Sequence, residues 1–142
     1  LTFDILNGGI HIKIIYSNKK QIIASKLSDL FLSVNWVSGN NPTKLAKALK
    51  NHSKVYTAWD GCRLVGLISS LDDGIMNAYI QYLLVNPAYQ GIGIGNRLLE
   101  ILTAEYHNYL NVSIISYKET VSFYEKHGFK DDNESQALFY TL

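Results

Sequence analysis

The sequence predicts a mixed α+β domain, and three observations lead to that prediction. β-type runs at 54–60, 62–71 and 75–85 are joined by short turn signals, which indicates an antiparallel meander. A glycine-rich turn follows and leads into a helical pattern over 94–106. Beyond it, short strand and helix patterns alternate, which is typical of folds that pack helices against a mixed sheet.

The first fifty residues predict one strand and two helices. Residues 10–16 alternate as a half-buried strand does, and apolar residues from 21 to 34 recur at helical spacing. Asn41-Pro42 is typical of an N-cap followed by proline at the first helical position, so a second helix is expected to run to about Lys50.

Turn residues set the limits of the later elements. Asp60-Gly61 is a hairpin signal, and Asp72-Asp73-Gly74 closes the second turn of the meander. The remaining expected elements are a strand at Val112–Ser116, a helix from about Thr120 to His127 that ends before Gly128, and a final strand containing Leu138, Phe139 and Tyr140.

Composition limits the class of protein. The 142 residues, 47% of them hydrophobic, predict a single domain over 1–142. Lys+Arg 13 against Asp+Glu 12 gives a net charge of +1, so no nucleic-acid partner is expected. No long apolar run and no export signal is visible, so we expect no membrane span and a cytoplasmic location. Cys62 is the single cysteine and the four histidines lack ligand spacing, so we expect no metal site.

The glycine-rich turn is the segment most informative about chemistry. Gly91, Gly93 and Gly95 precede a helix, so backbone N–H groups at its start lie open to close approach by an anion such as a phosphate. A P-loop requires Gly-Lys-Ser/Thr, but Asn96-Arg97 follows Gly95. A dinucleotide-binding turn requires glycine or alanine where Asn96 stands, and no acidic residue lies at the ribose-binding distance.

Two motifs give the chain a resemblance to a known family. Gln90-Gly91-Ile92-Gly93-Ile94-Gly95, preceded by Val85-Asn86-Pro87, resembles the acyl-CoA pyrophosphate loop of the GNAT superfamily of N-acetyltransferases. Phe123-Tyr124-Glu125-Lys126-His127-Gly128-Phe129 resembles a second segment of that family. The resemblance covers about residues 54–140. It implies a GNAT-like acyl-CoA N-acyltransferase fold, with a mostly antiparallel twisted central sheet, a splayed pair of strands and flanking helices.

The resemblance also implies acetyl-CoA as the acyl donor and assigns residues to it. The pantetheine arm would pair with the exposed backbone of the strand before the loop, here Leu83, Leu84 and Val85. Arg97 and Lys126 lie near the CoA phosphates or on a solvated face, and the sequence leaves both readings open. The pyrophosphate would be held at Gln90, Gly91, Ile92, Gly93, Ile94, Gly95 and Asn96.

Tyr124 matches the family tyrosine that points at the CoA sulfur, which implies that it is a catalytic general acid. It would protonate the thiolate as the leaving group departs. The alternative is that Tyr124 only packs on the inner face of the last helix, with Val121 and Phe123.

The group that deprotonates the amine is less apparent. Some family members carry a glutamate on the strand before the loop, but residues 74–85 contain no carboxylate. We therefore expect a water relay that touches Tyr79 or Tyr82. Asp72 and Asp73 are expected to stabilise the turn in which they lie and not to contact the acceptor. Trp36 is expected to contact the acceptor or to anchor the core, with no preference between the two.

The implied function is the direct transfer of an acetyl group from acetyl-CoA to a primary amine of a small molecule, peptide or protein. One alternative is a non-catalytic acyl-CoA-binding or regulatory module on the same fold, and another is an interaction domain without cofactor binding. A homodimer is an expectation from the family alone.

Overall fold

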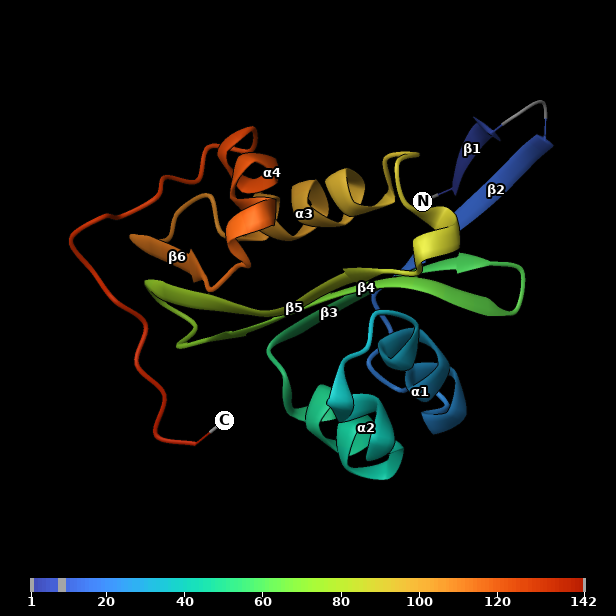
Figure 1. The fold of residues 1–142 in the computed structure, drawn as a ribbon, viewed down its shortest axis with the longest axis horizontal. Helices are drawn as coiled ribbons and strands as arrows, with labels where there is room; N and C mark the ends of the chain where they lie inside the picture. Colours follow the sequence, from blue (N-terminus) through green and yellow to red (C-terminus); the bar gives the residue numbers. More distant parts are fainter. Residues whose placement is uncertain (1, 8–9, 142) are drawn as a thin grey trace.

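A computed structural model describes residues 2–7 and 10–141 and shows one six-stranded sheet with helices on both faces (Figure 1). The spatial order of the strands is their order in the sequence. Neighbours from β1 to β5 are antiparallel, and β6 runs parallel to β5. The strands are β1 (Thr2–Asn7), β2 (Ile10–Ser17), β3 (Lys54–Asp60), β4 (Arg63–Asp72), β5 (Asn77–Val85) and β6 (Asn111–Ile114).

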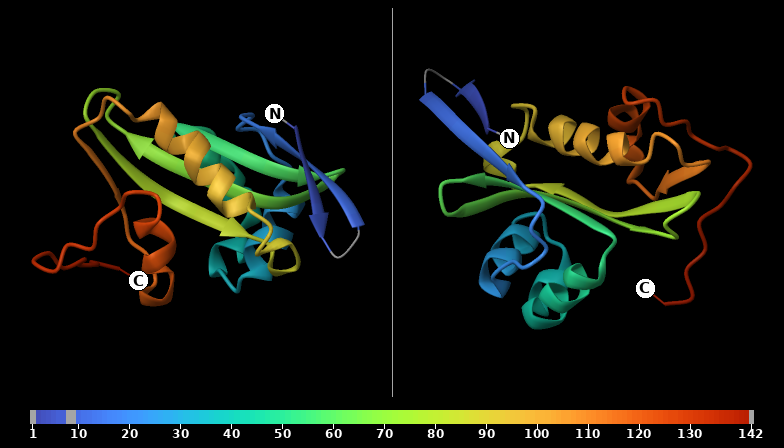
Figure 2. Two further views of the ribbon diagram at one scale, coloured as in Figure 1. Left: turned by 90° about the horizontal axis from the view of Figure 1, so that it is seen from above. Right: turned by 180° about the vertical axis from the view of Figure 1, so that it is seen from behind.

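Two pairs of helices cover the sheet. The first pair, α1 (Ala24–Ser33) and α2 (Pro42–Asn51), lies on one face, and the second pair, α3 (Ile94–Glu105) and α4 (Val121–Glu125), lies on the other (Figures 1 and 2). Short 3₁₀ helices occupy three connections: η1 (Val37–Asn40), η2 (Pro87–Tyr89) and η3 (Lys118–Thr120). Across the described residues, no helix combines the length and apolar character that crossing a membrane requires.

Strand β4 lies between two separate cores. Its residues Leu67 and Ile68 are fully buried, and they belong to different hydrophobic clusters. Leu67 packs in the cluster with Phe31 and Leu49 of the first helix pair, whereas Ile68 packs in the cluster with Leu98 of α3. Because successive side chains of a strand point to opposite faces, a near-continuous apolar run serves both cores.

The sheet opens between β5 and β6. The parallel pairing covers only Asn77–Ile80 of β5 against Asn111–Ile114 of β6. Beyond Ile80, β5 continues to Val85 along β4 but has no strand on its other side. This is the splayed pair that the family resemblance implies, and the opening positions the site described below.

The structure corrects three expectations. Strand β1 was not predicted, and helix α4 ends at Glu125 rather than His127. The predicted final strand at Leu138, Phe139 and Tyr140 is wrong, because residues 126–141 contain no strand and these three side chains are exposed. β-type residues form a strand only where a neighbouring edge pairs with them. Beyond α4 the segment instead passes around the end of the sheet without joining it (Figure 1).

Candidate active site

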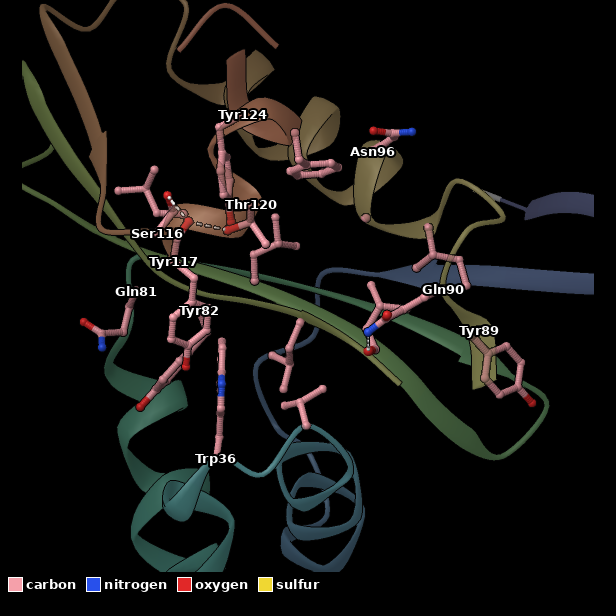
Figure 3. Close-up of a pocket in the computed structure, with 18 of the residues that line it drawn as sticks. Trp36, Gln81, Tyr82, Tyr89, Gln90, Asn96, Ser116, Tyr117, Thr120 and Tyr124 are labelled. Atoms are coloured by element: carbon pink, nitrogen blue, oxygen red, sulfur yellow. Dashed lines mark hydrogen bonds between the residues drawn. The ribbon is translucent and has the colours of Figure 1, made fainter. Parts of the chain in front are cut away.

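A pocket of about 1050 Å³ fills the opening between β5 and β6 (Figure 3). Its walls come from three separate parts of the chain: residues 34–38, residues 81–96 from β5 into the glycine-rich turn, and residues 114–124 from the end of β6 to α4. The fold therefore brings both family-like motifs to one cavity.

The backbone of β5 is exposed along one wall. The Asn86 N–H donates to the Val65 carbonyl of β4 at 2.8 Å. Since backbone groups alternate in direction along a strand, those of Leu84 also face β4, and those of Leu83 and Val85 face the pocket. The Gln90 side-chain amide donates to the Val85 carbonyl at 2.9 Å. The Leu83 N–H and C=O therefore remain directed into the opening.

The glycine-rich turn forms the far end of the pocket. Gly91 and Gly93 have φ values of 80° and 95°, and no atom lies within 4 Å of where a Cβ would stand on either. Gly93 is the N-cap of α3 and provides no side-chain cap. The first N–H groups of α3, which belong to Ile94, Gly95 and Asn96, therefore lack acceptors within the helix.

These features fit an anion such as the diphosphate of acetyl-CoA. Open amides at the start of a helix bind phosphate groups, and the missing glycine side chains leave room for close approach. Ile94 has a second function, because its side chain is buried in the core and anchors the turn to the sheet. Gln90 lines the pocket, and its side-chain amide donates to the Val85 carbonyl. Arg97 pairs with Glu100 at 3.5 Å, and the Lys126 side chain is exposed; the lining residues include neither.

Tyr124 both packs in the core and lines the pocket, so its catalytic role stays a prediction that its position allows. Its ring packs in the core against Phe123 and Phe129, at centroid distances of 5.1 and 5.7 Å. It also lines the pocket and points from α4 toward the turn at Ser116 and Thr120 (Figure 3). Burial raises the pKa of the Tyr124 hydroxyl to about 12, so this group keeps its proton at neutral pH and can donate a hydrogen bond.

Aromatic residues form the wall opposite Tyr124. Trp36 and Tyr82 line the pocket, and their rings lie 6.1 Å apart (Figure 3). Phe31 lies behind them, with its ring 6.0 Å from Trp36 and 5.0 Å from Tyr82. Trp36 therefore both faces the cavity and anchors the core of the first helix pair.

None of the lining residues is a carboxylate or a histidine. Tyr82 reaches the pocket, whereas Tyr79, the other tyrosine expected near the relay, is absent from the lining. Asp72 accepts from the Tyr106 hydroxyl at 2.7 Å, and Asp73 accepts the backbone N–H groups of three following residues. The bonds to Asp73 hold its pKa well below the usual range, and Asp72 also accepts the Gly74 N–H at 2.8 Å, so both carboxylates bond within the turn.

Several lining residues escaped the sequence interpretation. Ser116, Tyr117 and Thr120 form the wall between β6 and α4, and their hydroxyl contacts are local: Ser116 and Thr120 donate to the Tyr117 carbonyl at 3.2 and 3.0 Å. No motif marks them, because they reach the site only through the divergence of β6. In the described part of the chain, no three His, Cys, Asp or Glu side chains gather as metal ligands, and Cys62 is exposed.

Comparisons with known proteins agree with this geometry. The family model described as acetyltransferase (GNAT) domain matches residues 23–138. An uncharacterised N-acetyltransferase, ycf52, from Porphyra purpurea is 30% identical over 98% of this chain and 82% of its own length. A chloroplastic GCN5-related N-acetyltransferase 2 from Arabidopsis thaliana is 31% identical over 91% of this chain and 58% of its own. A Glycine max protein named histone acetyltransferase TAP1 is 32% identical over 86% of this chain and 58% of its own length.

Solved structures show the same fold. A GNAT-family acetyltransferase from Streptococcus pneumoniae has a TM-score of 0.79 at 25% identity, covering 91% of this chain and 98% of its own. A probable acetyltransferase from Staphylococcus aureus has a TM-score of 0.80 at 21% identity, covering 91% and 99%. With the family model matching most of its length, and both motifs lining one cavity, this chain belongs to the GNAT superfamily of N-acetyltransferases.

Proposed function

We propose that the protein transfers an acetyl group from acetyl-CoA directly to a primary amine. The observation that carries the proposal is one continuous cavity that joins the anion-binding turn, the open edge of β5 and the Tyr124 side chain. Acetyl-CoA contains a diphosphate, an amide-bearing arm and a thioester. It would therefore need an anion site, a backbone edge and a hydrogen-bond donor within one binding cleft.

The residues that would bind the donor follow from these contacts. The open amides at Ile94, Gly95 and Asn96 would hold the diphosphate, and the Leu83 N–H and C=O would pair with the amides of the arm. The donor supplies the thioester carbonyl that the amine attacks. The amine would enter from the side of Trp36 and Tyr82, which is the wall opposite Tyr124.

Tyr124 would act on the leaving sulfur. Its pKa of about 12 lies about 3.5 units above that of an ordinary thiol, so complete proton transfer to a free thiolate would be uphill by roughly 5 kcal/mol. Tyr124 would therefore stabilise the sulfur mainly by donating a hydrogen bond while the carbon–sulfur bond breaks. The amine would lose its proton through water, because no lining side chain is a conventional base, and Tyr82 is the predicted relay residue that lines the pocket.

The acceptor is proposed only as a class, namely a primary amine of a small molecule or of a peptide. The name of the soybean relative supports including a lysine side chain of a protein among the candidates. The homodimer and the cytoplasmic location expected from the sequence stay predictions.

Release of the CoA thiol, measured across primary alkylamines, amino sugars, peptide N-termini and lysine peptides, tests the proposal. We expect release with at least one class; stabilisation by acetyl-CoA without release from any amine would instead support a non-catalytic acyl-CoA-binding module. Tyr124→Phe should lower kcat by about 10²-fold and leave the Kd for acetyl-CoA nearly unchanged. Tyr140→Phe, at an exposed tyrosine, is the control and should change neither. Unchanged turnover in Tyr124→Phe would remove Tyr124 from the mechanism.

A further inference from the structure

Helix α4 carries Tyr124 but is too short to hold its own position. It contains five residues, Val121–Glu125, and residues 126–141 after it form no regular element. A helix of one turn is not stable alone, so contacts with the rest of the fold must fix where the Tyr124 hydroxyl lies.

The contacts that fix α4 are made with the first turn of α3. The Phe123 ring lies over Gly95, where a Cβ would stand 3.6 Å from the ring Cζ atom. The His127 Nε2 lies 2.9 Å from Asn96 Oδ1, so Nε2 carries a proton and donates to the amide oxygen. The His127 ring also packs against Phe123, with centroids 5.3 Å apart.

The His127–Asn96 bond has no substitute in the described part of the chain. Among the hydrogen bonds that the described residues from 118 to 141 make, it alone reaches another secondary-structure element of the sheet and helix core. The others stay within residues 117–141. Otherwise α4 is held by apolar packing. Such packing keeps the helix against the core but sets the position of a single atom, such as the Tyr124 hydroxyl oxygen, less closely.

We propose that His127 is a positioning residue that sets the distance between the anion-binding turn and the Tyr124 hydroxyl. The proposal rests on the proposed function. One donor molecule must reach the open amides of α3 with its diphosphate and Tyr124 with its sulfur at the same time. Asn96 belongs to the first turn of α3, and His127 is three residues after Tyr124, so their side-chain bond joins the two contact points directly.

This arrangement predicts a specific kinetic pattern. His127→Ala should lower kcat by about tenfold, because a small displacement of a group that acts on the reacting atoms is costly for rate. The Kd for acetyl-CoA should change by less than about twofold, because the bond uses the Asn96 side chain and leaves the backbone amides untouched. Asn96→Ala removes the same bond from its other end and should reproduce this pattern. His127→Gln keeps a donor N–H and should recover part of the rate.

The decisive measurement is a double-mutant cycle with Tyr124→Phe. If His127 acts through Tyr124, the double variant His127→Ala/Tyr124→Phe should be no slower than Tyr124→Phe alone. Rates that multiply would show that His127 acts independently and would overturn the proposal. His107→Ala is the matched control, since this exposed histidine lies just after α3, its ring nitrogen lies 3.0 Å from the Ala104 carbonyl, and its loss should leave kcat unchanged.

The outcomes also separate this inference from the proposed function. All rates are measured with the amine that gives the fastest CoA release, and the melting temperature of each variant shows whether it folds. Absence of release from every amine contradicts the proposed function. An active wild type, a slow Tyr124→Phe variant and a normal His127→Ala variant contradict the positioning role alone. If His127→Ala does not fold, Asn96→Ala carries the same cycle.

Discussion

Replacement of Gly93 by alanine tests the anion-binding turn most directly. Gly93 is the N-cap of α3 with φ 95° and ψ 4°, and nothing lies within 4 Å of the position of an added Cβ. The substitution therefore causes no clash, and its cost is the left-handed backbone conformation alone, about 1–2 kcal/mol. For a domain of this length that corresponds to a fall in melting temperature of about 3–8 °C.

The same substitution should weaken acetyl-CoA binding. The amides of Ile94, Gly95 and Asn96 follow Gly93 directly, so a backbone that relaxes toward negative φ turns them away from their common direction. Loss of one charge-assisted hydrogen bond is worth about tenfold or more in affinity. Calorimetric titration measures the Kd, and the shift of melting temperature with acetyl-CoA gives an independent value.

Two variants separate the conformational effect from a general loss of stability. Gly93→Asn should lose less affinity and less stability than Gly93→Ala, because asparagine adopts positive φ more readily. Gly74→Ala replaces another open glycine, with φ 77°, in the turn between β4 and β5. It should lower the melting temperature similarly and leave the Kd unchanged. Wild-type affinity in Gly93→Ala, or an equal loss in Gly74→Ala, would refute this account of the turn.

Two further substitutions test His52 and Trp36, whose rings pack on Tyr82 at 5.8 and 6.1 Å. Burial, reinforced by the charge of Lys20, lowers the pKa of His52, so the unfolded chain binds a proton more readily than the folded one. Stability should therefore fall as pH drops from about 7 to 5, and His52→Gln should flatten this dependence in urea unfolding at each pH; an unchanged slope would contradict the assignment. Trp36→Ala should raise KM for the amine by about tenfold and leave the Kd for acetyl-CoA within about twofold, because the indole packs on Tyr82 at the wall opposite Tyr124. An equal loss of acetyl-CoA affinity would show that Trp36 supports the whole cavity.

Local sequence signals were sufficient to predict the features whose structure depends on residues close together in the sequence. The Asp60-Gly61 hairpin forms as predicted, with Asp60 pairing Arg63. Pro42 begins α2, and Gly93 leads into α3. These features depend on backbone conformations that only a few residue types adopt, so composition and spacing reveal them. The predicted final strand failed for the complementary reason, since Leu138–Tyr140 needs a pairing edge that propensity does not supply.

The sequence by itself determined the family, the order of most elements and the place of the glycine-rich turn, because each depends on short motifs with fixed spacing. Tertiary structure decided which residues share the cavity. Trp36 reaches Tyr82, and His127 reaches Asn96, across separations in sequence that no local pattern spans. The divergence of β6 from β5 after Ile80 creates the space that the pocket occupies. Such contacts form because two helix pairs pack on one sheet. The free energy of that packing comes from many residues of the core together, so no short segment of the sequence reveals it.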